Sequence, residues 1–373
     1  MSVIEVADPV EAVVAGSGRR FSWKAAAIGL LAAGLLVELD LVVPYLGRAL
    51  STLDDPDLRW VLLAVAAEVV SMGAFARARR RMLAAGGTRV SARRMVGLTY
   101  AANAVNASLP GGAALAVGLV FRRLRSWGAT VPAAGFTILA SGVLSSVSFA
   151  LLAIVAAVVA GDGGTGSVLV IAVVVAAVLA ALVGRRFLRP GLGLQVVSAG
   201  LVRANRVLRR PADAGLAQLR RLIVDVTAIR PRNRDWLAGL AFAGLNWLAD
   251  LVCLVASCRA VDARGVTLVV VLVAYIAGMS AAGLSLLPGG LGVVDAAMIF
   301  ALTQGGIGVV PATAAVLLYR AVSLVLVVAV GWVALGVARV SARRARRSPV
   351  GIQPVGSTTS ALPPNERTGS AAA

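Results

Sequence analysis

Residues 108–121 read SLPGGAALAVGLVF, and residues 285–300 read SLLPGGLGVVDAAMIF. In both stretches a Pro-Gly-Gly triplet interrupts an apolar run that is otherwise typical of a membrane helix. The triplets are Pro110-Gly111-Gly112 and Pro288-Gly289-Gly290. Proline lacks a backbone donor and disfavours helical geometry at the preceding residue, so we expect each triplet to end one helix before the next begins.

The apolar arms beside the triplets predict two re-entrant hairpins, which enter the membrane and turn back inside it. The arms are residues 95–109 and 113–121 for the first hairpin, and 266–287 and 291–305 for the second. At about 1.5 Å per residue, the first two arms reach roughly 22 and 13 Å, enough to return from the bilayer midplane. The arm 266–287, at about 33 Å, is also long enough to cross completely.

Spacing beyond the triplets indicates an internal repeat. The proline that begins the next apolar run follows the proline of the triplet by 22 residues in the first case (Pro132) and by 23 residues in the second (Pro311). We therefore predict a unit of span, hairpin and span at 58–160 and again at 236–338. Arginine clusters flank the first hairpin and are nearly absent beside the second, so the two units are expected to have opposite orientations.

Composition places the whole chain in the membrane class. Hydrophobic residues make up 59% and charged residues 14% of the sequence, against about 25% charged in soluble proteins, which excludes a soluble enzyme. We predict an all-α polytopic membrane protein, with about six full spans and two re-entrant hairpins in an inverted repeat, or about seven to eight spans by conventional counting. The expected spans are 25–46, 58–76, 130–160, 167–184, 236–257 and 309–338.

The arginines predict the topology. The net charge is +19, and positive residues in short loops stay in the cytoplasm. The membrane domain 25–338 is therefore expected in a bacterial plasma (inner) membrane, with inside loops at 77–94 and 185–235 and cytoplasmic ends at 1–24 and 339–373. We expect the positive charge to bind anionic lipids of the inner leaflet, and we expect no nucleic-acid partner. Docking of a cytoplasmic protein on the amphipathic loop 185–235 stays open, and the final Ser/Thr/Pro/Gly/Ala-rich stretch is expected to be disordered.

Residue types argue against catalysis. Histidine is absent, and Cys253 and Cys258 are the only cysteines. This excludes His-based acid–base chemistry and His-containing metal sites, and the cysteines are interpreted as inert packing residues. We expect no catalytic residue, no metal, no cofactor and no enzymatic activity.

Ionisable side chains at membrane depth are the first candidates for function, because each costs about 2.5–3.5 kcal/mol to insert. They are Glu68, Asp250, Asp295 and Arg320. Asp295 and Arg320 can form an ion pair that joins the second hairpin to the last span. Alternatively, Arg320, next to Tyr319, can bind a lipid phosphate that exchanges with Asp295, and both interpretations can hold in a switch.

The broken helices supply the other candidates. An interrupted helix exposes backbone amides and the positive end of its dipole, which suit a phosphate, although the glycines can also serve only to permit a tight turn. Asn103, Asn106 and Ser108 can bind headgroup hydroxyls or, as we favour, cap the broken helix. The predicted substrate-binding residues are thus Arg320, Asp295, Tyr319, Pro288, Gly289, Gly290, Pro110, Gly111, Gly112, Asn103, Asn106, Glu68 and Asp250.

Two stretches resemble a known family. PGGLGVVDAAMIF (288–300) and AAVLLYRAVSLV (314–325) look like the signature of the flippase-type membrane domain of lysylphosphatidylglycerol synthases and of stand-alone relatives tied to polyprenyl-linked glycolipids. The resemblance covers about 25–338. The first half departs from the family, with Ala113-Ala114 and Ala140-Ser141-Gly142 where acidic residues and arginines are common. No aminoacyl-transferase domain follows in this sequence, so lysine transfer is not expected.

The resemblance implies a flippase that moves an anionic phospholipid or a polyprenyl-phosphate-linked lipid by alternating access. The expected partner is accordingly a membrane lipid with a phosphate headgroup. Two other classes stay open. One is a membrane-embedded transferase acting on a lipid phosphate, and the other is a lipid-binding scaffold that transports nothing.

Overall fold

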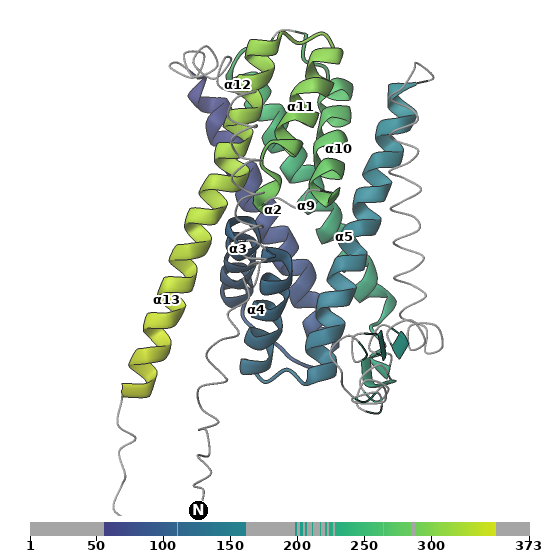
Figure 1. Ribbon diagram of the computed structural model, residues 1–373, viewed down its shortest axis with the longest axis vertical. Helices are drawn as coiled ribbons and strands as arrows, with labels where there is room; N and C mark the ends of the chain where they lie inside the picture. Colours follow the sequence, from purple (N-terminus) through teal and green to yellow (C-terminus); the bar gives the residue numbers. More distant parts are fainter. Residues whose placement is uncertain are drawn as a thin grey trace, which may run out of the picture. The chain divides into compact units, whose positions relative to one another are not determined.

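The computed structural model describes residues 56–109, 111–161, 228–263, 265–284 and 288–347, together with a few residues between 198 and 226. Every element in these ranges is a helix (Figure 1). The elements are α2 (Leu58–Ala85), α3 (Ala92–Ser108), α4 (Gly112–Ser126), α5 (Val131–Ala160), α9 (Asn233–Ala260), α10 (Leu268–Leu284), the 3₁₀ turn η2 (Pro288–Gly290), α11 (Val293–Gln304), α12 (Val309–Arg320), the π-helical η3 (Ala321–Leu326) and α13 (Val327–Arg347).

Four described helices are long and apolar enough to span a membrane: Leu58–Ala85, Val131–Ala160, Asn233–Ala260 and Val309–Ala338. The predicted all-α architecture is thereby confirmed for the described residues, and four of the predicted spans coincide with helices that are long and apolar enough to cross a membrane. The predicted spans 25–46 and 167–184, Pro110, most of 185–235 and the end of the tail lie outside the described residues.

A polar residue caps the N-terminus of α2 and of α5, just before the apolar run of each helix begins. Asp57 accepts a hydrogen bond from the amide of Arg59 at 2.9 Å, and Thr130 accepts one from Ala133 at 3.3 Å. Each cap satisfies an amide that the first helical turn leaves unpaired. One predicted boundary was wrong: α2 continues to Ala85, so Arg77, Arg79, Arg80 and Arg81 lie on the helix and not in a loop. Arginine is a good helix former, and its charge alone does not end a helix.

The order of elements is the same in both halves of the chain. A long helix is followed by a short helix, a Pro-Gly-Gly break, a second short helix and another long helix (Figure 1). The first helices, α2 and α9, each have 28 residues, and the second helices, α3 and α10, each have 17. A 17-residue helix is about 25 Å long, shorter than the roughly 30 Å hydrocarbon core. Within the predicted arm 266–287, the described helix α10 covers Leu268–Leu284.

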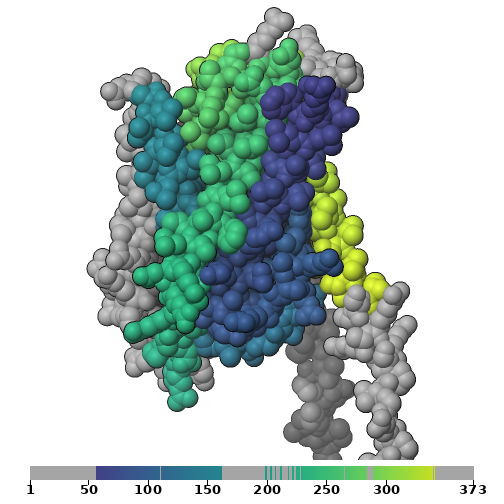
Figure 2. Space-filling view, turned by 180° about the vertical axis from the view of Figure 1, so that it is seen from behind, coloured from purple at the N-terminus to yellow at the C-terminus, as the bar shows by residue number. Residues whose placement is uncertain are grey.

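Helices α2 and α9 run antiparallel along their whole lengths. The amide of Asp57 donates to the carbonyl of Ala260 at one end, at 3.0 Å. Near the middle, Asn246 Nδ2 donates to Ser71 Oγ at 2.7 Å. At the other end, Arg81 Nε lies 2.8 Å from Asp235 Oδ1. Figure 2 shows the two helices in contact on one face of the molecule. This register decides which side chains meet at the centre.

Each half has its own apolar core. One core gathers buried residues of α3 and α4 with parts of α2 and α5, and includes Met95 and Leu124. The other gathers α9, α10, α11 and α12 with the start of α2 and the end of α5, and includes Tyr275 and Met298. Two compact units are distinguished, Met1–Leu335 and Gly336–Ala373, and the residues discussed below all belong to the first.

Candidate functional site

The two breaks lie next to each other inside the first unit. A Cβ atom built on Gly289 would stand 3.5 Å from the carbonyl oxygen of Ala107, near the end of α3. Gly111 and Gly289 both have φ of 67°, and Gly290 has φ of 65°, values that glycine adopts without steric cost. The broken ends of the α3–α4 pair and the α10–α11 pair thus meet at one place (Figure 1).

Arg320 lies at this meeting point and is held by two groups. Its Nε lies 2.8 Å from Asp295 Oδ1, and its Nη2 donates to the carbonyl oxygen of Gly289 at 2.7 Å. The predicted ion pair of Asp295 and Arg320 is therefore present. The Nε–Oδ1 contact does not meet hydrogen-bond geometry, so it is an ion pair without an aligned hydrogen bond. Asp295 is oriented by the amide of Gly292, which donates to Oδ2 at 3.1 Å.

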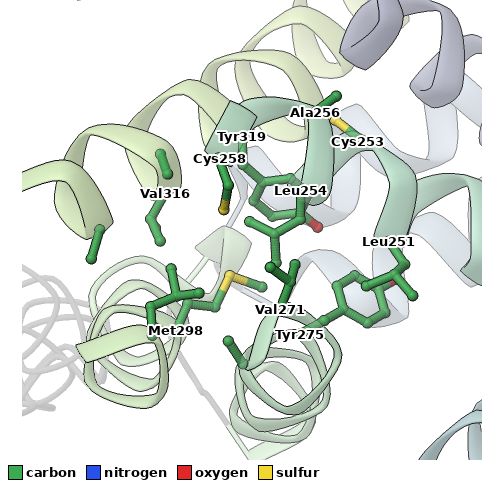
Figure 3. Close-up of a cluster of buried hydrophobic side chains, with 14 of the residues drawn as sticks. Leu251, Cys253, Leu254, Ala256, Cys258, Val271, Tyr275, Met298, Val316 and Tyr319 are labelled. Carbon is green, nitrogen blue, oxygen red and sulfur yellow. The ribbon is translucent and has the colours of Figure 1, made fainter. Parts of the chain in front are cut away.

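A second polar cluster lies one residue away along α12. The hydroxyl of Tyr319 contacts Asp250 Oδ1 at 3.0 Å, and the hydroxyl of Tyr275 donates to Asp250 Oδ2 at 2.7 Å. Figure 3 shows both tyrosines inside the core, with Leu254 and Met298. The side chain of Asp250 is thus oriented by α10 and α12 together.

Glu68 of α2 completes this cluster. Its carboxyl group is within hydrogen-bonding reach of Asp250, it is only 2% exposed, and its Oε2 atom has no hydrogen-bond donor among the described residues. No three Asp, Glu or Cys side chains of the described part form a metal site. Six predicted site residues, together with Tyr275, therefore form two clusters. The acidic cluster is Glu68, Asp250, Tyr275 and Tyr319, and the arginine cluster is Asp295, Arg320 and Gly289.

The structure separates two residues that the sequence placed together. Tyr319 and Arg320 are neighbours in the chain but belong to the acidic cluster and the arginine cluster, respectively. Sequence reasoning missed Tyr275. Its signal was a phenol in the otherwise apolar run 266–287, since a buried tyrosine hydroxyl needs a polar partner.

The preferred role of Asn103 as a cap was wrong. Its amide donates to the carbonyl of Thr99, one turn back in α3, at 3.0 Å, and helical geometry favours that local bond over the distant broken end. Asn106 is exposed. Ser108 accepts a hydrogen bond from Trp332 Nε1 at 3.2 Å, which joins the end of α3 to α13. Headgroup binding by Asn103 and Asn106 stays a prediction.

Arg79 is a charged residue that the sequence assigned to a loop. The extension of α2 places its guanidinium against the ring of Phe75, with Cζ 4.6 Å from the ring centroid. Its Nε and Nη1 atoms are buried and have no hydrogen-bond partner among the described residues. A cation over an aromatic face is stabilised by the ring quadrupole, yet the two nitrogens remain free to bind an anion.

Interrupted apolar helices that meet around buried charges define a multi-pass membrane protein with a central polar site. Residues 23–331 match the family described as the lysylphosphatidylglycerol synthase TM region, and the chain belongs to this family. The resemblance found in the sequence is thereby confirmed. No curated protein matches the chain. Membership supports a lipid-related function in a membrane.

Proposed function

We propose that the protein is a transporter, and not an enzyme, that moves an anionic phospholipid or a polyprenyl-phosphate-linked lipid between leaflets. The observation that carries this proposal is the position of Arg320. Arg320 donates a hydrogen bond to the carbonyl of Gly289 in the second Pro-Gly-Gly turn and forms an ion pair with Asp295. Asp295 is an anion that another anion can replace. A guanidinium recognises phosphate as readily as carboxylate, because both accept paired N–H donors.

In this proposal, a lipid phosphate replaces Asp295 as the partner of Arg320. The side chains of Arg320 and Asp295 are 13% and 16% exposed, so the pair is partly shielded and not sealed off. Exchange of one anion for another avoids leaving the arginine charge unpaired, which would be costly in an apolar environment. Arg79 has two buried nitrogens without a partner in the described part of the chain, and it offers a second anion contact toward the C-terminal end of α2.

The symmetric arrangement of the breaks supports alternating access. Helices α3 and α4 and helices α10 and α11 are interpreted as re-entrant hairpins of an inverted repeat, with their ends meeting near the midplane. The antiparallel pair α2–α9 would be the axis about which one half moves. The six-residue π-helical stretch η3 directly follows Arg320, and such stretches often occur at functional sites. The inner membrane and cytoplasmic termini complete the proposed topology.

Lipid movement in proteoliposomes tests the proposal. Vesicles of phosphatidylethanolamine and phosphatidylglycerol carry a trace of fluorescent phosphatidylglycerol, and dithionite quenches the label exposed outside. We expect wild-type protein to move the label across the bilayer, Arg320→Lys to move it more slowly, and Asp295→Ala/Arg320→Ala to fold but move none. The charge of lysine remains, but its planar fork is lost.

Arg259→Ala serves as the matched control, because Arg259 is an exposed arginine in the last turn of α9. Its lipid movement should equal that of the wild type. Full activity of a folded Asp295→Ala/Arg320→Ala protein would overturn the phosphate site. Absence of movement by wild-type protein with fluorescent phosphatidylglycerol and with a fluorescent polyprenyl phosphate would overturn the transport function.

A further inference from the structure

The acidic cluster has a composition that phosphate binding does not explain. Two carboxyl groups, Glu68 and Asp250, face each other inside the protein, and an anionic lipid would be repelled by them. The register of α2 and α9 requires this approach: from the contact between Ser71 and Asn246, each acid lies about one helical turn farther in the same direction. The facing of the two acids therefore follows from the packing of the helices.

The charge around the pair is not balanced by direct contact with a cation. Among the described residues, Asp250 is contacted by two neutral hydroxyls, of Tyr275 and Tyr319. The positive charge of Arg320 attracts Asp250 electrostatically, but Arg320 is held by Asp295 and Gly289. A hydrogen bond between two carboxyl groups requires a proton on one of them. The unpartnered Oε2 of Glu68, which is 2% exposed, marks where a further proton or donor can be received.

Groups from several helices face the pair and set its surroundings. Tyr100 of α3 interacts electrostatically with Glu68, and Cys253 of α9 interacts electrostatically with both acids. Tyr275 comes from α10, and Tyr319 and Arg320 come from α12. Arg320 is the only permanent charge in this set, so the charge of the pair can change only by gain or loss of a proton by the acids.

Helix α12 joins the pair to the arginine cluster. Tyr319 contacts Asp250, and the next residue, Arg320, holds the second Pro-Gly-Gly turn. A change in the charge of Asp250 alters both the hydrogen bond to Tyr319 and the electrostatic attraction of Arg320. Protonation of the pair thereby weakens one of the forces that keep Arg320 in place and favours its release to another anion.

We propose that Glu68 and Asp250 form a proton-binding pair that couples lipid movement to the proton gradient. The inference rests on the proposed transport function. In each cycle, a proton from water at one face forms an O–H bond with a carboxylate oxygen of the pair. That bond breaks when the proton leaves to water at the opposite face, and the electron pair stays on the oxygen. No other co-reactant is needed.

Accumulation of a fluorescent lipid against a pH gradient tests the coupling. Vesicles of phosphatidylethanolamine and phosphatidylglycerol hold the full-length protein and a trace of fluorescent phosphatidylglycerol. A one-unit pH step is a tenfold proton ratio, so coupling of one proton to one lipid should shift the leaflet ratio of the label by up to about tenfold. A protonophore should abolish the shift, and Glu68→Gln and Asp250→Asn should give a leaflet ratio that does not respond to the gradient.

Asp262→Asn is the matched control, since Asp262 is exposed and has φ of 46°, which asparagine tolerates. It should behave as wild type. Lipid movement that is identical with and without the gradient in wild-type protein would overturn the coupling and leave the transport function standing. If neither the wild-type protein nor any variant moves the lipid, with or without a gradient, the transport function itself is overturned.

Infrared spectroscopy provides a readout that does not depend on transport. The C=O stretch of a protonated carboxyl group should be visible in wild-type protein and should titrate with pH. It should be lost or displaced in Glu68→Gln and in Asp250→Asn, and unchanged in Asp262→Asn. Wild-type protein without such a band, or variants with the same band, would overturn the proton-binding pair even if lipid movement were lost.

Discussion

The two Pro-Gly-Gly breaks share a backbone geometry and differ in charge. Gly111 and Gly289 have the same φ of 67°, and each break joins two short helices that follow a long one. Beyond the first break the chain continues Ala113-Ala114, whereas beyond the second it carries Asp295. Arg320, on the long helix after the second break, reaches back to both Asp295 and Gly289.

The difference shows that repetition of the fold does not require repetition of the site. The first half supplies the surface against which the second turn packs, through the carbonyl of Ala107. The second half supplies the charge. By contrast, the acidic cluster is shared between the halves, with Glu68 from α2 and Asp250 from α9. Substitutions at related positions should therefore have unequal effects.

The largest effect is expected at the charged break. Arg320→Ala leaves Asp295 partly buried without its cation, and should lower the free energy of unfolding by about 3–5 kcal/mol. Asp295→Ala/Arg320→Ala should recover much of that loss. Chemical unfolding in detergent, followed by tryptophan fluorescence, measures both variants. If the double variant is as unstable as the single one, the ion pair is not what holds the second break.

A smaller effect is expected from the glycines of the uncharged break. A Cβ on Gly112 would overlap the carbonyl of Asn106 and lie 2.6 Å from that of Val105, so Gly112→Ala should cost about 2–3 kcal/mol through forced backbone shifts. Gly111→Ala meets open space and should cost only about 1–2 kcal/mol for its left-handed conformation. Thermal unfolding of the two variants compares them. An equal loss would mean that close packing at the first break is not what Gly112 provides.

In a third comparison, removing the hydroxyl should destabilise the protein more at Tyr275 than at Tyr100, which lies on the corresponding short helix. Tyr275 of α10 donates to Asp250 at 2.7 Å, so Tyr275→Phe should cost about 1–3 kcal/mol. Tyr100 of α3 is buried near Glu68 but makes no hydrogen bond to a described residue, so Tyr100→Phe removes none and should change stability by less than about 0.5 kcal/mol. Thermal unfolding of both purified variants measures the two losses of stability. A larger loss for Tyr100→Phe would indicate that the α3 tyrosine anchors the acidic cluster.

The smallest effect is expected at the end of the α2–α9 pair. Arg81 and Asp235 approach to 2.8 Å, but the arginine side chain is 41% exposed. Arg81→Ala should therefore cost no more than about 1 kcal/mol. Unfolding at low and high salt measures this contribution, which should vanish when salt screens the charges. A loss comparable with that of Arg320→Ala would mean that the exposed end, and not the central site, holds the halves together.

The sequence by itself determined the helices, the two breaks and the family. Runs of apolar residues predict membrane helices because an unpaired backbone group in hydrocarbon is costly. Proline and glycine predict the interruptions because their backbone preferences are local. The ion pair of Asp295 and Arg320 was also predictable, since few charges occur at membrane depth and a buried charge needs a partner.

Only the tertiary structure decided which side chains share a site. Neighbouring residues of an α-helix point about 100° apart, so Tyr319 and Arg320 meet different helices, and their partners depend on how α9, α10 and α11 pack. The approach of Glu68 to Asp250 likewise depends on the register of α2 against α9, which distant contacts such as Asp57–Ala260 fix. Local sequence carries no information on such a register, because it results from packing of surfaces that are far apart in the chain.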